Sequence, residues 1–323
     1  MRRLIFLAAV ISALIIAACG GGGGDSTDGA DDPTTSRWPD VLELSDREFT
    51  PLPLNSQIIV GDSRFLLGLL DSEQQLVLGA DLTLRFVKIE NEEGQLKAER
   101  PATYISLIEN FVHEHEDGTG HTHEGPEVGA YTARVPFDEP GSWGVQIDGV
   151  ANGVEIENLR VRFSVLDMGT GTIPAIGAPA PPSEQVTLQD VADISEIDTA
   201  NPPHPDLHDT TIAAALATGR PIVVAFTTPA FCVTRICGPV LDEVVLPLYE
   251  EFQDRAIFIH VEPYLIDVAR SGGGLVPVQA LDDWGLPTEP WIFIIDEAGN
   301  VAAKFEGFTN IGEVEPALLE VLN

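Results

Sequence analysis

Basic residues and cysteine are both scarce in this 323-residue sequence. Its 51 Asp and Glu outnumber 17 Lys and Arg, only three of which are lysine, and the formal net charge is −34. Proteins that hold nucleic acid or anionic lipid headgroups electrostatically need clustered basic side chains. The composition therefore excludes a nucleic-acid partner and excludes docking on a membrane through a basic patch.

Cysteine occurs only three times, as Cys19, Cys232 and Cys237. A scaffold stabilised mainly by disulfides needs more, and an odd number requires one cysteine to have a separate role. Long apolar runs are also missing, because no stretch after residue 18 approaches the length of a membrane-spanning helix. The length suggests about two domains, each able to bury its own core.

Residues 1–18 have the pattern of a signal peptide, with Arg2 and Arg3 followed by a short apolar run over residues 4–18. The run ends in Ile16-Ala17-Ala18-Cys19, which resembles the bacterial lipobox. That resemblance implies cleavage before Cys19, lipidation of its thiol and an extracytoplasmic protein anchored to the bacterial cell membrane. Residues 19–37, rich in Gly, Ser and Asp, are interpreted as a flexible tether. A plain secretory signal and an N-terminal membrane helix are the alternatives.

Residues 38–167 are predicted to form the first domain, an all-β one. Apolar and polar residues alternate over residues 131–135 and 160–165, a pattern typical of strands with one buried face. Further strands are expected at residues 57–60, 64–70, 82–89, 103–108 and 143–148. About seven short strands favour an immunoglobulin-type sandwich. Residues 141–149, Gly-Ser-Trp-Gly-Val-Gln-Ile-Asp-Gly, resemble a strand of small bacterial extracytoplasmic Ig-like domains of the YtkA-like kind.

A histidine-rich stretch interrupts this domain. His113, His115, His121 and His123 form two His-x-His pairs on either side of a glycine-containing turn. On a hairpin the two pairs could face each other, and imidazole with neighbouring carboxylates suits Zn²⁺, Cu²⁺ or Ni²⁺. The alternative is a solvated polar loop that is merely rich in histidine.

Residues 168–183 are a Gly/Pro-rich linker, and residues 184–323 are predicted to form a second domain in which helices and strands alternate. Helices are expected at residues 210–218, 240–252 and 313–322. The runs at 221–226, 256–261 and 291–295 are apolar throughout, as in strands covered on both faces, and a hairpin leads from the last to residues 301–305.

From about residue 174 to 323 this order resembles the thioredoxin fold, which is α/β. Residues 176–181, Ile-Gly-Ala-Pro-Ala-Pro, resemble the entry segment of extracytoplasmic thioredoxin-like proteins, and the segment from Pro290 to Val301 resembles their cis-proline strand and hairpin. The resemblance implies that Pro290 packs beside the active-site sulfurs; Pro287 is the competing candidate, at a spacing that fits worse. It also implies thiol–disulfide exchange through Cys232 and Cys237, without a required cofactor.

The spacing of the cysteines departs from that family, because Cys232 and Cys237 form C-x4-C where C-x-x-C is usual. Two residues five apart on one continuous helix lie about 140° apart around its axis. A disulfide between them therefore requires a turn that ends before the helix, which Gly238-Pro239 suits because proline favours the first helical turn. Atypical peroxiredoxins also contain C-x4-C, but their proline and threonine positions hold Ala225 and Pro229 here.

Two neighbours are predicted to tune these thiols. Arg235 would assist formation of a thiolate, and Glu289, just before the proposed cis-proline, would oppose it if its side chain points inward. The choice of nucleophile stays open, since the family position favours Cys232 and proximity to the helix favours Cys237.

The remaining histidines are not assigned a function. His260 ends a buried strand and is interpreted as structural. Copper-assembly proteins of the Sco type have two cysteines and a downstream histidine on this fold, but His260 lies too early in the chain for that match. His204 and His208 are interpreted as residues of a solvated loop.

Three functions follow from this sequence. The favoured one is a lipid-anchored oxidoreductase that exchanges thiols and disulfides with extracytoplasmic protein partners. The second is a non-enzymatic copper or zinc handler that uses the histidine-rich loop or the two cysteines. The third is a scaffold in which the Cys232–Cys237 disulfide is structural.

Overall fold

The computed structural model describes Trp38, residues 48–114 and residues 120–323; in 109–114 and 120–124 it describes only the backbone. The predicted signal peptide, Cys19 and the tether lie outside this part of the chain. Within it, no helix is both long enough and apolar enough to cross a membrane.

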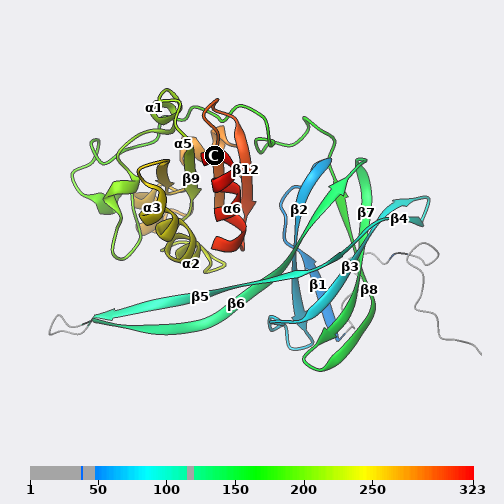
Figure 1. Ribbon diagram of the computed structural model, residues 1–323. Helices are drawn as coiled ribbons and strands as arrows, with labels where there is room; N and C mark the ends of the chain where they lie inside the picture. The colour runs from blue at the N-terminus through cyan, green and yellow to red at the C-terminus, as the bar shows by residue number, and fades with distance from the viewer. Residues whose placement is uncertain (1–37, 39–47, 115–119) are drawn as a thin grey trace, which may run out of the picture. The chain divides into compact units, whose positions relative to one another are not determined.

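The strands of the described structure form three four-stranded sheets (Figure 1). The first has the order β1 (Phe49–Pro53), β2 (Gly61–Asp71), β6 (Gly120–Phe137) and β5 (Thr103–Glu114). The second has the order β4 (Glu93–Pro101), β3 (Asp81–Glu90), β7 (Gly141–Ala151) and β8 (Val154–Val165). All neighbouring strands in these two sheets are antiparallel.

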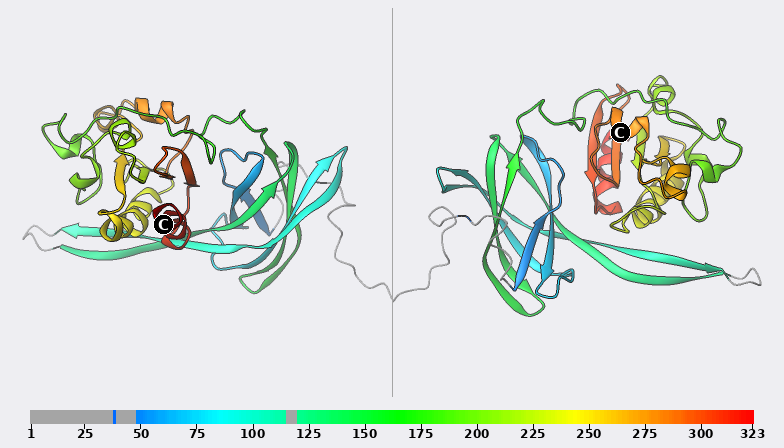
Figure 2. Two further views of the ribbon diagram at one scale, coloured as in Figure 1. Left: turned by 45° about the horizontal axis from the view of Figure 1, so that its top comes forward. Right: turned by 180° about the vertical axis from the view of Figure 1, so that it is seen from behind.

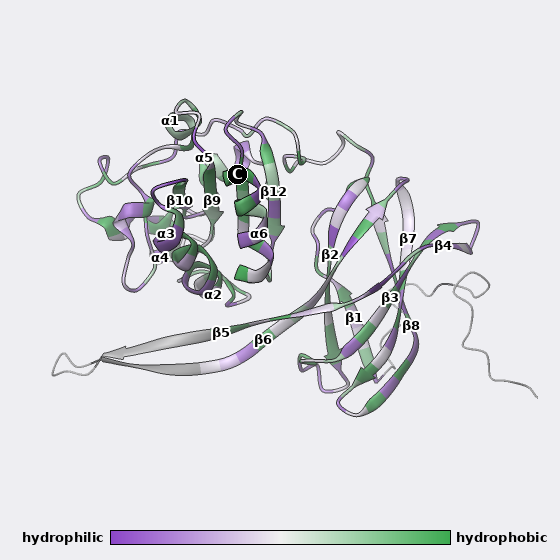
Figure 3. Ribbon diagram, in the orientation of Figure 1, coloured by the Kyte–Doolittle hydropathy of each residue, from purple (hydrophilic) through white to green (hydrophobic). Residues whose placement is uncertain are grey.

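The alternating residues of these strands bury one face of each sheet. Phe65 and Leu67 of β2 join Phe86 of β3, Phe137 of β6 and Trp143 of β7 in one apolar core. Figure 3 shows apolar and polar residues following one another along β8. Period-two alternation therefore predicted this half of the chain correctly as antiparallel β structure.

Two strands of these sheets were not predicted, and one predicted strand is absent. β1 contains two prolines in five residues and β4 is largely polar, so neither has the apolar signal of a strand. Residues 57–60 make only an isolated bridge, between Ile59 and Leu166. Asn91 and Glu92 make the turn between β3 and β4, with φ values of 49° and 69°, in the left-handed region that two-residue hairpin turns favour.

The third sheet has the order β10 (Ile257–Val261), β9 (Ile222–Phe226), β11 (Trp291–Ile295) and β12 (Val301–Glu306). β9 and β10 are parallel, whereas β11 is antiparallel to both β9 and β12. Its helices are α1 (Ile212–Leu216), α2 (Cys237–Val240), the π-helical turn η4 (Leu241–Val245), α3 (Leu246–Phe252), α4 (Ile266–Arg270), α5 (Gln279–Asp283) and α6 (Ile311–Leu322). Two 3₁₀ turns, η2 (Ile194–Glu196) and η3 (Pro205–Leu207), precede them.

Side chains of the central strand β9 enter two separate cores. Val223 and Ala225 pack with residues of η4, α3 and α6, whereas Ile222, Val224 and Phe226 pack with residues of α1 and α5. Figures 1 and 2 show helices on both sides of this sheet. Burial on both faces explains why the strand contains no polar residue.

The predicted fold class, an immunoglobulin-like sandwich followed by an α/β domain of thioredoxin type, is wrong. Strands account for 40% of the described residues and helices for only 19%. The observed helices are short: α1 to α5 have four to seven residues and only α6 reaches 12. α4 and α5 were not predicted. The immunoglobulin type is not confirmed for the two antiparallel sheets.

Proline and an irregular turn account for the short helical pieces around residue 245. The segment predicted as one helix over residues 240–252 consists of α2, η4 and α3. Pro247 lies in the first turn of α3 and lacks the N–H that would donate to the carbonyl of Glu243. The π-helical turn accommodates this gap, as such turns do elsewhere.

The hydroxyl of Tyr131 on β6 links two buried backbone groups. It donates to the carbonyl of Val77 at 2.8 Å and accepts from the N–H of Ala80 at 2.9 Å. We predict that Tyr131→Phe lowers the free energy of unfolding by about 1–3 kcal/mol, because both groups lose a partner without access to water. Urea unfolding measures this loss.

Tyr104→Phe is the matched control, because the Tyr104 ring packs against Tyr131 but its hydroxyl donates to Glu127 at the surface. That change should cost less than about 0.5 kcal/mol. Equal losses in the two variants would contradict the structural importance given to the Tyr131 hydroxyl.

Candidate functional site

The two downstream cysteines form a disulfide at the carboxyl end of β9. Their Cα atoms are 6.0 Å apart, within the range that the bond requires. The intervening residues form a turn in which the Arg235 N–H donates to the Cys232 carbonyl at 3.3 Å. Cys232 precedes the helical segment as predicted, whereas Cys237 is the first residue of α2 rather than lying ahead of it.

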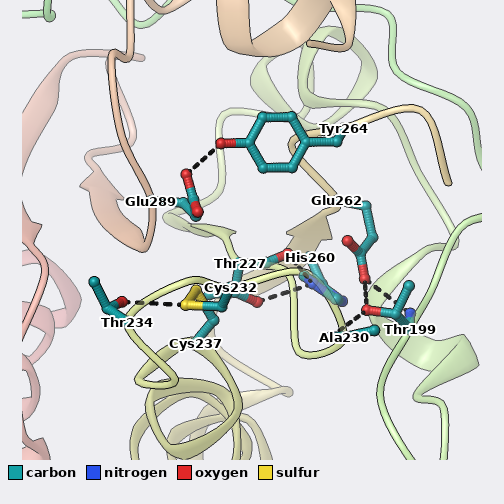
Figure 4. The surroundings of a disulfide bond; sticks show 10 residues. All are labelled: Thr199, Thr227, Ala230, Cys232, Thr234, Cys237, His260, Glu262, Tyr264 and Glu289. Carbon is teal, nitrogen blue, oxygen red and sulfur yellow. Dashed lines mark hydrogen bonds between the residues drawn. A yellow bond between two sulfur atoms is a disulfide. The ribbon is translucent and has the colours of Figure 1, made fainter. Parts of the chain in front are cut away.

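The two sulfur-bearing residues differ sharply in exposure. Cys237 has a relative exposure of 0%, while Cys232 is half-buried and the next residue, Val233, is 84% exposed. The Cys232 sulfur lies 3.3 Å from the Thr234 hydroxyl (Figure 4). A protein thiol approaching from solvent therefore meets Cys232 first, and Cys237 lies behind it.

Arg235 occupies the apex of this turn. Its φ angle is 60°, in the left-handed region, and the residue is exposed. The predicted assistance of a thiolate by Arg235 stays a prediction, because no contact between this side chain and either sulfur is described.

Glu289 lies beside the disulfide, as the prediction of an inward-pointing carboxylate required. A carboxylate oxygen of Glu289 and the two sulfur atoms lie within 4.8 Å of one another, and the Tyr264 hydroxyl donates to this carboxylate (Figure 4). Burial raises the pKa of Glu289, although the Tyr264 hydrogen bond partly opposes that shift. Burial and the same hydrogen bond also raise the pKa of Tyr264 above its ordinary value.

The peptide bond between Glu289 and Pro290 is cis, as the sequence predicted in preference to Pro287. Pro290 is buried and leads directly into β11, which is paired with β9. Its backbone carbonyl accepts from the Gly307 N–H at 2.9 Å. These contacts hold Glu289 at the edge of the sheet, next to the cysteines.

Sequence reasoning missed a second cluster, formed by Asp198, His208 and His260. One ligand atom of each residue lies within 4.8 Å of the others, and all three residues are buried. His208 Nε2 is 3.3 Å from an Asp198 oxygen, and His260 Nδ1 is 3.8 Å from the other. The interpretation of His208 as a solvated loop residue is wrong, since its relative exposure is 3%; His204 is half-buried.

Asp198 is held as a carboxylate in spite of its burial. Burial by itself raises the pKa of the Asp198 carboxyl group. The hydrogen bond with His208, the nearby His260 and the backbone N–H groups of His204 and Ala200 outweigh that effect and hold the pKa well below its usual range. Burial also lowers the pKa of His260, to about 4, so this ring is neutral near pH 7.

Thr199 connects this cluster to the cysteine loop. Its hydroxyl donates to Glu262 and accepts from the N–H of Ala230, the latter at 3.0 Å (Figure 4). Burial raises the pKa of Glu262 to about 7, against hydrogen bonds from Thr199 that lower it. One short segment thus contacts both the histidine cluster and the loop that leads to Cys232.

The backbone of the histidine-rich stretch is a β-hairpin. In the ladder between β5 and β6, His113 is directly opposite His121, and His123 is opposite Phe111. Whether the two His-x-His pairs face each other stays a prediction, because only the backbone of this stretch is described. His115 lies outside the described residues.

Comparison with known proteins does not identify the family of this chain. No protein-family model matches the chain, and no curated protein matches its sequence. The lipidation of Cys19 stays a prediction, because residues 1–37 are outside the described structure.

Glu289 makes the stability of the protein depend on pH in a defined direction. Its folded-state pKa is raised above the ordinary 4.5, so the folded state binds more protons than the unfolded chain just above that pH. The stabilisation that protonated Glu289 provides is present in acid and is lost as the pH rises through the raised pKa. We predict that Glu289→Gln is more stable than the wild type at pH 8 and that the difference disappears near pH 4.

Urea unfolding with the disulfide intact measures this difference at the two pH values. Glu297→Gln, at an exposed glutamate in the turn after β11, is the matched control and should show no such pH dependence. The same difference between Glu289→Gln and wild type at both pH values would contradict the burial of this carboxylate.

Proposed function

We propose that this protein exchanges thiols and disulfides with protein partners outside the cytoplasm through Cys232 and Cys237. The unequal exposure of the two cysteines supports the proposal, because exchange requires one sulfur that a partner can reach and a second that can resolve the product. The half-buried Cys232 and the fully buried Cys237 meet that requirement.

The proposed exchange starts at the accessible sulfur. A partner thiolate attacks Sγ of Cys232, the Cys232–Cys237 bond breaks, and Cys237 leaves as a thiolate while a mixed disulfide forms. A second partner thiolate then attacks the partner sulfur of that mixed disulfide and releases Cys232 as a thiolate. The partner dithiol loses two electrons and becomes a disulfide, and the cysteine pair gains them. When the Cys232–Cys237 pair has a lower reduction potential than the partner, the same steps run in reverse and the partner disulfide is reduced.

Glu289 is proposed to carry the proton in this reaction. A carboxylate oxygen close to both sulfurs, held by the Tyr264 hydroxyl, can accept the proton that Cys237 must lose before it attacks the mixed disulfide. In the opposite direction the protonated carboxyl can return it to the leaving Cys237 thiolate. The raised pKa of Glu289 brings the acid closer in strength to a thiol, which favours transfer in both directions.

A structural disulfide is the competing function for the same pair. A five-residue separation encloses a short loop, so the bond restricts the unfolded chain little. The two functions differ in reduction potential, because structural disulfides of exported proteins lie below about −300 mV, whereas catalytic pairs lie above it.

We predict opposite phenotypes for the two cysteine variants, each made with Cys19→Ser so that only the pair is tested. Cys237→Ser should accumulate a mixed disulfide with a small thiol, because the exposed Cys232 forms it and no second sulfur resolves it. Cys232→Ser should leave a buried thiol that iodoacetamide modifies slowly until the protein unfolds. Intact-mass measurement follows both changes, and neither variant should accelerate the reduction of insulin by dithiothreitol.

The wild-type pair with Cys19→Ser is the control and should catalyse insulin reduction. Equal rates of alkylation for the two single thiols would show that the exposure difference is not maintained in solution. A potential below about −300 mV together with no insulin reduction would assign the bond a structural role.

A second candidate function, metal binding by the histidine-rich hairpin, is favoured by the register of β5 and β6. Directly opposite residues of an antiparallel pair have Cβ atoms about 5 Å apart, and His113 and His121 are such a pair. Histidine is a common ligand of Zn²⁺ and Cu²⁺, so this pairing favours a site for either ion.

We predict that replacing His113, His115, His121 and His123 together with Asn lowers the number of Cu²⁺ ions bound per full-length chain. Isothermal titration with the disulfide intact measures that number, and His204→Asn is the single-histidine control. Retention of full binding by the fourfold variant would end this second proposal.

A further inference from the structure

The buried cluster of Asp198, His208 and His260 has no part in the proposed exchange reaction. Asp198 follows η2, His208 follows η3 and His260 lies in β10, so three separate segments contribute one side chain each. The side chains have relative exposures of 0%, 2% and 0%. A carboxylate and two imidazoles removed from water need a specific reason to be together, because burying charge without compensation is unfavourable.

Hydrogen bonding determines which nitrogen of His260 carries a proton. Nε2 lies 3.0 Å from the backbone carbonyl of Thr227, and a carbonyl oxygen can only accept. The Thr227 hydroxyl, 2.9 Å from the same nitrogen, can accept as well. A proton on Nε2 therefore fits both contacts with Thr227, whereas a lone pair there would face the lone pairs of the carbonyl. In the neutral ring Nδ1 then has a free lone pair, and this buried atom has no hydrogen-bond partner.

The free lone pair of His260 is directed at the carboxylate side of the cluster. Nδ1 lies 3.8 Å from Asp198 Oδ1, too far for a hydrogen bond. The carboxylate oxygen is also an acceptor, so these two atoms are electron donors with no proton between them. A cation placed near both atoms would convert this unfavourable contact into two coordinate bonds.

The separations match those of a metal coordination shell. With metal–ligand distances of about 2.0–2.1 Å, neighbouring ligands of a tetrahedral Zn²⁺ lie about 3.3 Å apart. The separation between His208 Nε2 and Asp198 is 3.3 Å, and that between His260 Nδ1 and Asp198 is 3.8 Å. The two imidazole rings have centroids 5.0 Å apart, and one ligand atom of each of the three residues lies within 4.8 Å of the others.

We propose that Asp198, His208 and His260 form a binding site for one divalent first-row metal ion, with Zn²⁺ as the preferred occupant. Two imidazoles and one carboxylate are a ligand set that Zn²⁺ accepts readily, and three protein ligands leave a fourth position for water or a small ligand. The hydrogen bond from His260 to the Thr227 carbonyl is the kind of outer contact that orients a metal-binding histidine.

An adjoining cavity provides the fourth position and a route for the ion. It has a volume of about 340 Å³ and is lined by both histidines, by Glu262 and by Tyr264. Its wall also includes Glu184 and Glu196, which add negative charge along the route. The cavity is large enough for water and for a small anion or carbonyl compound at the metal.

The test uses the full-length chain in which the four hairpin histidines are Asn and Cys19 is Ser, with the Cys232–Cys237 disulfide intact. These changes remove the hairpin and the reduced thiols as competing ligands. After equilibration with Zn²⁺ and gel filtration, we expect about one Zn²⁺ per chain by elemental analysis. Titration with Co²⁺ should give the intense visible absorption of a four-coordinate centre.

Asp198→Asn in this background should lower the Zn²⁺ affinity at least about tenfold, because the amide loses the charge and keeps only one of the two oxygens that accept backbone N–H groups. His260→Gln should also lower the Zn²⁺ affinity at least about tenfold. His204→Gln, in the loop between Asp198 and His208, is the control and should bind Zn²⁺ with the affinity of the parent protein. Thermal unfolding with and without Zn²⁺ compares each variant with its own metal-free form, so a loss of stability is not mistaken for a loss of binding.

Substoichiometric Zn²⁺ in the parent protein, or an affinity that Asp198→Asn leaves unchanged, would overturn the proposal. The cluster would then be a hydrogen-bonded connection between residues 198–208 and the sheet. The outcome is independent of the exchange function, because insulin reduction by Cys232 and Cys237 is measured separately.

Discussion

The burial of strand β9 on both faces is the constraint on which the rest of the C-terminal part depends. Ile222 to Phe226 contain no polar side chain, and their removal from water requires apolar residues from helices on each side of the sheet. Once the strand is fixed in this way, the residues that follow it are fixed as well. Thr227 then meets His260, and the loop that begins there places Cys232 over Cys237.

The parts of this arrangement that the sequence predicted share a local physical signal. Strands with a continuous apolar run, such as residues 222–226 and 291–295, were found to within one residue, because burial on both faces leaves no other composition possible. The cis-proline at 290 and the cysteine pair were identified by short motifs. The overall fold class was predicted wrongly, because it depends on the lengths of the helices. Pro247 and the π-helical turn η4 limit those lengths.

The histidine cluster could not be predicted for a different reason. Asp198, His208 and His260 are separated by up to 62 residues, come from two loops and one strand, and have no characteristic spacing. The one usable signal was a histidine within an otherwise apolar strand, because a buried imidazole needs a polar partner. That signal predicts a partner without identifying it. The geometry that brings Asp198 to His260 arises from the folded loop, where backbone N–H groups of Ala200 and His204 bind its carboxylate.

Thr199 connects the histidine cluster to the loop that contains Cys232 through hydrogen bonds. Its hydroxyl donates to Glu262, which lines the cavity beside the histidine cluster, and accepts from the N–H of Ala230 in the loop that contains Cys232. Any change in that loop when the disulfide opens acts on the same segment that positions Asp198. Free-energy coupling is reciprocal. A ligand in the cavity that changes the reduction potential of the disulfide must therefore bind the oxidised and reduced proteins with affinities that differ by the corresponding factor.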